Sequence, residues 1–366
     1  MKESNGCIWG LVVKGHRCLQ TIRGVLAGFG VLLLAGCTGL GTKTVVWDRA
    51  AYSQAVGDSW KREALLNIVR LRYVDIPVFM QISSIVNGYS RRGAVNGSLN
   101  PFKLQDTLDV GGDFSFEERP TISYAPMSGV EFTSLLQPIP VVIPLALIES
   151  SWRADLVLRM TVRSINDVGS RTRDSKGIER LSPKFLRILA LIRQIQESGM
   201  LGMETRKGKG AADATVLFFR KGHMDAATSE AIGELKQLLG LQPEITEFRV
   251  ARSSRAMDGS TLVIRTRSVV QIMSEFAAYV EVPPADQEKG VVLQGAPPDE
   301  NQLVTIHSGT ERPEKAQVAV AYDGHWFWID RNDLESKLHF AYLLAIIRTS
   351  SGGESGNGPV LTIPTG

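Results

Sequence analysis

The stretch Gln-Val-Ala-Val-Ala-Tyr-Asp-Gly-His-Trp-Phe-Trp-Ile, residues 317–329, gives the clearest fold signal in the chain. Asp323-Gly324 suits a two-residue turn with positive φ, so the apolar runs on either side are expected to pair as an antiparallel hairpin. A further strand before the hairpin would complete a β-meander over 302–330. Asp333 is expected to begin the helix that follows.

Helix and strand signals alternate through residues 178–366, the second of two expected parts of the chain. Ser182-Pro183 starts a helix well, because the Ser hydroxyl can cap it and Pro fits the first helical position. Residues 45–170, the first part, are expected to be strand-rich. The predicted fold class is therefore α+β, with mixed sheets and packed helices, ending in the meander and a final helix.

The sequence pattern also predicts the individual elements of each part. In the first part we expect a helix over 59–73, a strand over 78–89, a hairpin over 109–123 broken near Glu118-Arg119-Pro120, a helix to Leu136 with a capping box of Ser128 and Glu131, a helix over 145–149 and a strand over 156–165. In the second part we expect helices over 182–199, 225–239, 268–280 and 333–347, strands over 215–219, 245–251, 261–267 and 303–307, and a linker over 283–300.

The N-terminal region has the features of a secretory signal peptide. A basic lead ending at Arg23 precedes a short apolar run, which closes in Val-Leu-Leu-Leu-Ala-Gly-Cys at residues 31–37. Its ten apolar or glycine residues, Val25 to Leu34, are about half the roughly 20 residues that a transmembrane helix needs. Removal of the signal, residues 1–36, would leave residues 37–44 as a short tether.

The last four residues of that run, Leu34-Ala35-Gly36-Cys37, resemble the lipobox of bacterial lipoproteins. In that family the chain is cut before the Cys, here between Gly36 and Cys37, and lipid is attached to the Cys. The resemblance implies that Cys37 carries a lipid anchor, which three acyl chains would make nearly permanent. It also implies the outer membrane, since Thr38 stands where Asp would favour retention at the inner membrane.

An uncleaved membrane helix is the alternative for this region. Residues 24–42 carry no charge, and their length of 19 is borderline for a membrane span. Six of these residues are glycine, and the last five, Thr38 to Thr42, are not a lipid-facing sequence. Cleavage is therefore the favoured expectation.

Charge and cysteine content bound the function of the mature chain. The whole sequence has 41 basic and 38 acidic residues, and removal of residues 1–36 leaves 37 of each sign. A formally neutral chain lacks the positive excess that bulk electrostatic binding of nucleic acid requires, so no nucleic-acid partner is expected. Cys7, Cys18 and Cys37 all lie at or before the cut, which excludes an internal disulfide and a thiolate metal site beyond it.

No catalytic signature is evident in the sequence, and neither a metal nor a cofactor is expected. The histidines beyond the cut are not spaced as ligand pairs; they are His223, His307, His325 and His339. Histidine remains suited to proton transfer near neutral pH, so His307 and His325, on neighbouring strands of the meander, are the pair of greatest interest. The run 202–210 contains Gly and Lys but lacks phosphate-loop spacing, which favours a surface loop.

Trp326-Phe327-Trp328 is the most unusual aromatic cluster in the sequence. A strand would place Trp326 and Trp328 on one face, and Phe327 with Ile329 on the other. Two interpretations stay open: a central strand covered on both faces, or a strand whose free face contacts a partner or a glycan. Trp326 and Trp328 are therefore the candidate contact residues.

Several blocks across the mature chain carry a wider resemblance. They are Leu65 to Tyr73 with Pro77 to Phe79, Arg119 to Ile122 with the capping box, Thr266 to Ser268, Trp326 to Asp330 and Pro359 to Thr362. These blocks resemble a family of uncharacterised predicted lipoproteins of Gram-negative bacteria. That family has no known activity, so the resemblance implies location and overall fold and transfers no functional residue.

Together these features predict a lipid-anchored protein of the bacterial envelope, on the outer membrane and facing the periplasm. We expect it to be a binding or scaffold accessory of an envelope assembly, with the membrane and other envelope proteins as partners. Tethering would raise local concentration at the membrane without chemistry. The alternative is an envelope hydrolase that uses histidines and carboxylates of residues 178–366.

Overall fold

The computed structural model describes residues 40–99, 108–173, 179–207, 214–220, 222, 224–252, 258–296, 302–350 and 360–362. The chain divides into two compact units, residues 1–60 and residues 61–366. The expected signal, its cleavage site and Cys37 lie outside the described residues, as does His223.

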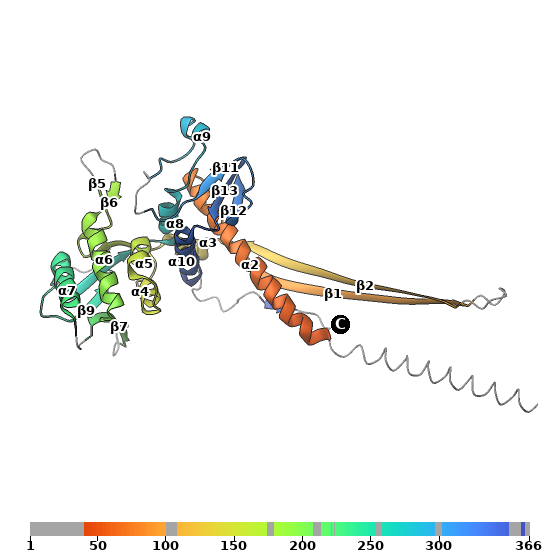
Figure 1. Ribbon diagram of the computed structural model, residues 1–366, viewed down its shortest axis with the longest axis horizontal. Helices are drawn as coiled ribbons and strands as arrows, with labels where there is room; N and C mark the ends of the chain where they lie inside the picture. The colour runs from red at the N-terminus through yellow and green to blue at the C-terminus, as the bar shows by residue number, and fades with distance from the viewer. Residues whose placement is uncertain are drawn as a thin grey trace, which may run out of the picture. The chain divides into compact units, whose positions relative to one another are not determined.

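The first described element is helix α2, Leu40–Arg72 (Figure 1). It confirms the helix expected over 59–73 but begins earlier, inside the stretch expected as a tether. Leu65, Ile68 and Val69 are fully buried, as their helical spacing predicts. After the helix, the side chain of Asn67 binds both backbone groups of Val78: its Nδ2 donates to the Val78 carbonyl at 2.8 Å, and its Oδ1 accepts from the Val78 N–H at 2.9 Å.

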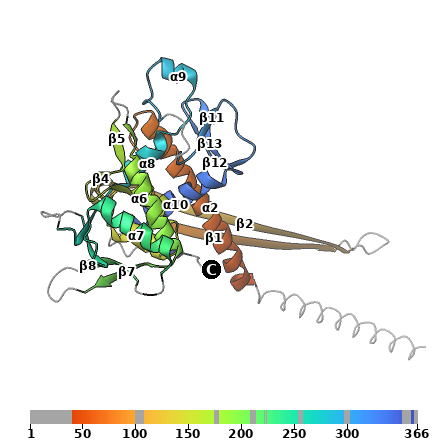
Figure 2. The same cartoon turned by 60° about the vertical axis from the view of Figure 1, so that its left-hand side comes forward.

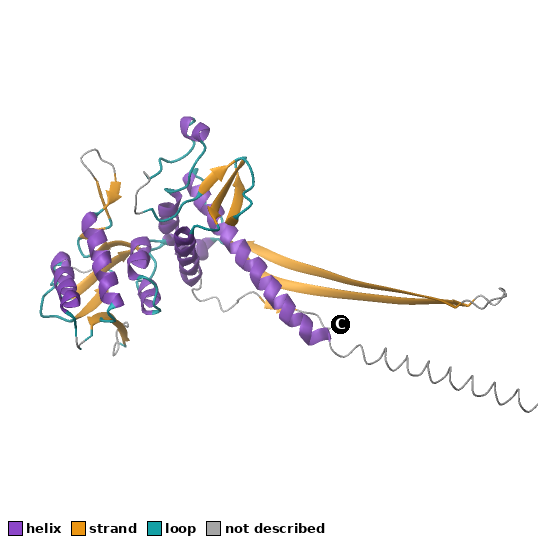
Figure 3. Cartoon of the chain, in the orientation of Figure 1, coloured by secondary structure: helices purple, strands orange, loops and turns teal. Residues whose placement is uncertain are grey.

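A long hairpin follows, formed by β1, Met80–Leu99, and β2, Leu108–Pro126. The strands pair from Met80 opposite Pro126 to Leu99 opposite Leu108, and β14, Val360–Thr362, adds a parallel strand to β1. Figure 3 shows both long strands. The hairpin expected over 109–123, with a break near Glu118-Arg119-Pro120, was wrong, because 109–123 lies wholly within β2. Pro120 pairs with Asn87 inside β2, and β2 is an edge strand, where a missing N–H is tolerated.

Three short helices then cross the region expected to be strand-rich: α3, Gly129–Leu136, α4, Val142–Glu149, and α5, Ala154–Thr161. The expected capping box of Ser128 and Glu131 was wrong, because the Ser128 side chain makes no cap hydrogen bond. The strand expected over 156–165 was also wrong for its first half. Residues 156–158 are all buried, so their apolar run carried no alternation that could separate a helix from a strand.

A six-stranded mixed sheet forms the centre of the larger unit. Its strands, in spatial order, are β4 (Val168–Gly169), β3 (Val162–Ile165), β10 (Thr261–Thr266), β9 (Glu247–Ala251), β8 (Ala214–Phe219) and β7 (Leu201–Arg206). The sheet joins strands from both sides of the division expected between 170 and 178. Helices α6, Pro183–Glu197, and α7, Ala226–Leu239, lie side by side over it (Figure 2). Between β4 and α6, β5 (Arg171–Arg173) and β6 (Glu179–Leu181) form a separate two-stranded sheet.

The helix boundaries in this region follow the capping residues of the sequence. The Ser182 hydroxyl accepts from the Phe185 N–H, and the Asp225 carboxylate accepts from the Thr228 N–H. Ser268 and Gln271 complete a capping box at the start of α8, Val269–Ala277. The sequence analysis did not predict strand β7. Its first residues come directly after the end of α6, so they carry no separate strand signal.

The meander is confirmed as an antiparallel sheet of β11, His307–Gly309, β12, Ala316–Tyr322, and β13, His325–Asp330. Its turn has φ of 45° at Asp323 and 77° at Gly324, the positive values that the sequence predicts. The first strand lies later than the expected 303–307. Helix α10, Leu334–Ser350, follows the meander, and α9, Pro284–Glu288, occupies part of the expected linker. The fold is α+β, as predicted.

We predict that Asn67→Leu lowers the free energy of unfolding by about 1–3 kcal/mol, because two backbone groups of Val78 lose their partner. Urea unfolding followed by circular dichroism measures the change. The exposed Asn332→Leu is the matched control and should change stability by less than about 0.5 kcal/mol. Equal stability of the Asn67 variant and the parent would show that this clamp is not structural.

Candidate functional site

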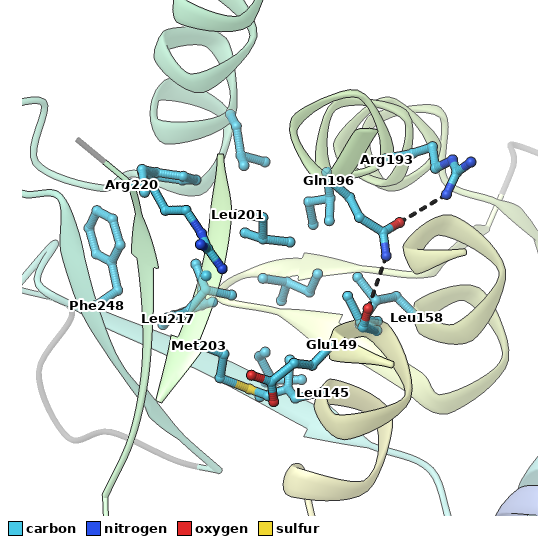
Figure 4. Close-up of a pocket in the computed structure, with 18 of the residues that line it drawn as sticks. Leu145, Glu149, Leu158, Arg193, Gln196, Leu201, Met203, Leu217, Arg220 and Phe248 are labelled. Atoms are coloured by element: carbon cyan, nitrogen blue, oxygen red, sulfur yellow. Dashed lines mark hydrogen bonds between the residues drawn. The ribbon is translucent and has the colours of Figure 1, made fainter. Parts of the chain in front are cut away.

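An apolar cavity of about 410 Å³ lies between the central sheet and helices α4, α5, α6 and α7 (Figure 4). Its walls are mainly leucine and isoleucine, with one methionine and two phenylalanines. The lining apolar residues are Leu145, Ile148, Leu158, Ile165, Ile192, Leu201, Met203, Leu217, Phe219, Leu235, Leu239, Leu241, Phe248, Leu262 and Ile264. Volumes of about 300–1,000 Å³ are usual for small-molecule sites, so the cavity has the size of a ligand pocket.

Strand alternation explains why the wall that the sheet contributes to the cavity is apolar. Leu217 on β8 lies opposite Phe248 on β9, and Ile264 on β10 lies opposite Ile165 on β3. Successive side chains of a strand point to opposite faces, so these pairs share the face that α6 and α7 cover. The helices complete the wall with aliphatic residues such as Ile192.

Gln196 fixes the position of α6 relative to the end of α4. Its Nε2 donates to the carbonyls of Ile148 at 3.1 Å and Trp152 at 2.7 Å, and its Oε1 accepts from the Ala154 N–H at 3.0 Å. Arg193 Nη1 donates to the same Oε1 at 3.0 Å. The amide is therefore occupied by structural bonds between α6 and the chain that joins α4 to α5.

Charged side chains lie at the mouth of the cavity. Arg193 forms an ion pair of 2.5 Å with Glu197, whereas Glu149 and Arg220 extend toward the cavity from opposite sides (Figure 4). Within the described ranges, no carboxylate lies within ion-pair distance of the Arg220 guanidinium. An apolar interior with a carboxylate and a guanidinium at its mouth can accept the chain of an amphiphile and solvate its polar end.

Sequence reasoning did not find this cavity. Each wall residue carries the ordinary signal of a core position, and apolar periodicity cannot tell a filled core from one with a space in it. Arg220 was the single available hint, as a charge directly after an apolar strand.

The predicted contact residues Trp326 and Trp328 lie together on one face of the meander. They are half-buried, whereas Phe327 and Ile329 on the opposite face are fully buried. Register places Gly309 beside Trp326 and His307 beside Trp328, and the Arg312 guanidinium lies 5.5 Å from the Trp326 ring centroid. β13 is the central strand of its three-stranded sheet, and the face that carries Trp326 and Trp328 is only partly covered.

The structure does not bring His307 and His325 together. His307 lies opposite Trp328, and His325 is three residues from Trp328, so the two histidines point to opposite faces of the sheet. His307 Nδ1 lies 3.1 Å from Glu281 Oε2 on an exposed surface, and His325 Nδ1 lies 3.1 Å from the Asp323 carbonyl.

His339 is completely buried in α10. Burial lowers the pKa of His339 from the ordinary 6.5. The Leu303 carbonyl and Glu335 partly oppose this shift, whereas the positive charges of Arg159 and Arg153 lower the pKa further. The Leu303 carbonyl lies beside the ring without the geometry of a hydrogen bond. Burial and the lowered pKa favour the neutral imidazole in the folded protein.

Because the folded pKa of His339 lies below its unfolded value, the unfolded chain binds the extra proton first as the pH falls. We predict that the free energy of unfolding decreases as the pH drops below about 6.5, by up to about 1.4 kcal/mol per pH unit. His339→Phe should flatten this slope in urea unfolding between pH 5 and 8. His325→Gln is the matched control, and an unchanged slope in the His339 variant would contradict the assignment.

The chain matches no protein-family model, and neither the curated proteins nor the solved structures contain a match. The described residues contain no group of three or more His, Cys, Asp or Glu side chains arranged to hold a metal ion. Among the helices that the structure describes, none has both the length and the apolarity to cross a membrane.

Proposed function

We propose that this protein is a lipid-anchored bacterial lipoprotein on the outer membrane, facing the periplasm, that acts by binding as an accessory of an envelope assembly. The signal peptide and the lipobox resemblance at Leu34 to Cys37 support the location. The resemblance of several blocks to predicted Gram-negative lipoproteins supports it as well. The half-exposed Trp326 and Trp328 are the proposed contact surface for another envelope protein, since Trp is enriched where binding energy is concentrated.

The single observation that carries the binding role is the apolar cavity. The cavity opens at a charged mouth, so its apolar walls contact water when no ligand is bound. An apolar chain in the cavity is stabilised because its surface leaves water and its atoms contact the walls. The proposed ligand is a single-chain amphiphile, with its polar end at Arg220 and Glu149.

A second candidate function is an envelope hydrolase. The observation that favours it is the approach of His307 Nδ1 to Glu281 Oε2 at 3.1 Å, since a carboxylate can orient a histidine base. The pair lies on an exposed surface and outside the cavity, so water exclusion does not strengthen it. Hydrolysis that is lost in both His307→Gln and Glu281→Gln would favour this function over binding.

We predict that Cys37→Ala releases the protein from membranes, because the thiol that would accept lipid is gone. Fractionation of cell envelopes, followed by immunoblotting, measures the change. Cys18→Ala is the control and should leave the protein in the membrane fraction. Retention of the Cys37 variant in membranes would disprove the anchor.

We predict that Leu217→Trp weakens binding of a fluorescent single-chain phospholipid at least about tenfold, because the larger ring occupies part of the cavity. Fluorescence titration of the purified full chain measures the dissociation constant. Leu293→Trp, which adds the same ring at a side chain that is 53% exposed, should leave affinity within about twofold. Equal weakening by both variants, or no saturable binding by the parent, would refute the cavity as a ligand site.

A further inference from the structure

A second, polar cleft of about 860 Å³ lies on the other face of the central sheet. Strand alternation places it there: Ile165 and Ile264 line the apolar cavity, whereas their neighbours Ser164 and Arg265 line the cleft. The cleft is thus separated from the cavity by one layer of strands.

Five arginines line this cleft, and two of them are already engaged. Arg267 is 5% exposed and donates to the Arg159 carbonyl at 3.1 Å, to the Met160 carbonyl at 3.3 Å, to the Val162 carbonyl and to Ser170 Oγ at 2.8 Å. Glu275 pairs with Arg171 and lies 3.7 Å from Arg267. These two arginines and Glu275 therefore form the wall of the cleft.

The other three arginines, Arg163, Arg252 and Arg265, are exposed. In the part of the chain that the structure describes, none of them has an ion-pair partner. The one remaining carboxylate of the cleft is Asp167, so three positive charges face one negative charge. The open part of the cleft carries an excess of two positive charges.

Two further observations indicate that an anion belongs in this cleft. Burial lowers the pKa of Arg267, and the negative charge of Glu275 opposes this shift. The positive charges of Arg171 and Arg163 lower the pKa of Arg267 further, because like charges lie close together here. Ser164, 8% exposed, lies at the floor of the cleft, and its Oγ has no hydrogen-bond partner among the described residues. An anion would relieve the charge repulsion and could accept a bond from this hydroxyl.

We propose that this cleft binds the phosphate group of a small molecule or of a lipid head group, through Arg163, Arg265 and Arg252. A phosphate monoester carries about −1.5 to −2 charges and three acceptor oxygens, which matches the excess of two positive charges. Guanidinium groups bind such oxygens through paired N–H donors. The site does not depend on the proposed function, because it shares no residue with the apolar cavity or the lipid anchor.

Calorimetric titration of the purified full chain tests the proposal with two probes. Glycerol 3-phosphate represents a soluble phosphate, and dihexanoyl phosphatidic acid, kept below its micelle concentration, represents a lipid head group with the same phosphate monoester. Saturable binding of either probe supports the site, and the tighter probe identifies the source of the phosphate. If neither probe binds with a dissociation constant below about 10 mM, the proposal is overturned, because a built phosphate site would bind more tightly than that.

The combined variant Arg163→Gln and Arg265→Gln should raise the dissociation constant at least about tenfold, because two charge-assisted contacts are lost. Arg249→Gln is the matched control: Arg249 is an exposed arginine on neighbouring β9 that does not line the cleft. It should leave affinity within about twofold. Equal weakening by the control would show that binding depends on general surface charge and would overturn the proposed site. If circular dichroism shows that the combined variant is unfolded, Arg265→Gln alone replaces it, with an expected loss of at least about threefold.

Discussion

The alternation of side chains along the strands of the six-stranded sheet is the constraint on which the larger unit depends. On β10, Ile264 faces the apolar cavity below α6 and α7, and Arg265 faces the polar cleft. On β3, Ile165 faces the cavity and Ser164 faces the cleft. A shift of one residue in register would place arginine in the apolar cavity and isoleucine in the polar cleft. One sheet thereby supports two sites of opposite chemistry.

Arg267 secures the register of these strands. Its buried guanidinium donates to carbonyls where α5 passes into β3 and to Ser170 beyond β4, and it has Glu275 on α8 as its counterion. A buried charge is costly unless its hydrogen bonds are satisfied, so the bonds of Arg267 specify one arrangement of these elements. The short β3 and β4, with few ladder bonds of their own, are held in place by this side chain.

The two proposed sites suit a protein that is held at a membrane surface. An apolar cavity accepts the chain of an amphiphile, and a cleft with excess positive charge accepts a phosphate; both kinds of group occur in lipids and in envelope polymers. Neither site contains a histidine, and the exposed His307 and Glu281 pair lies outside both. Binding is the role that we propose for both sites.

The sequence by itself determined the features that depend on neighbouring residues: the Asp323-Gly324 turn, the helix starts at Ser182 and Ser268, and the α+β class. Such signals act within a few residues, so no tertiary contact was needed to identify them. The tertiary structure alone decided that 156–161 is a helix, that Pro120 lies within a continuous edge strand, and that the walls of the cavity and the arginines of the cleft converge. Those outcomes depend on contacts such as Ile165 with Ile264, which lie far apart in the sequence and leave no local pattern.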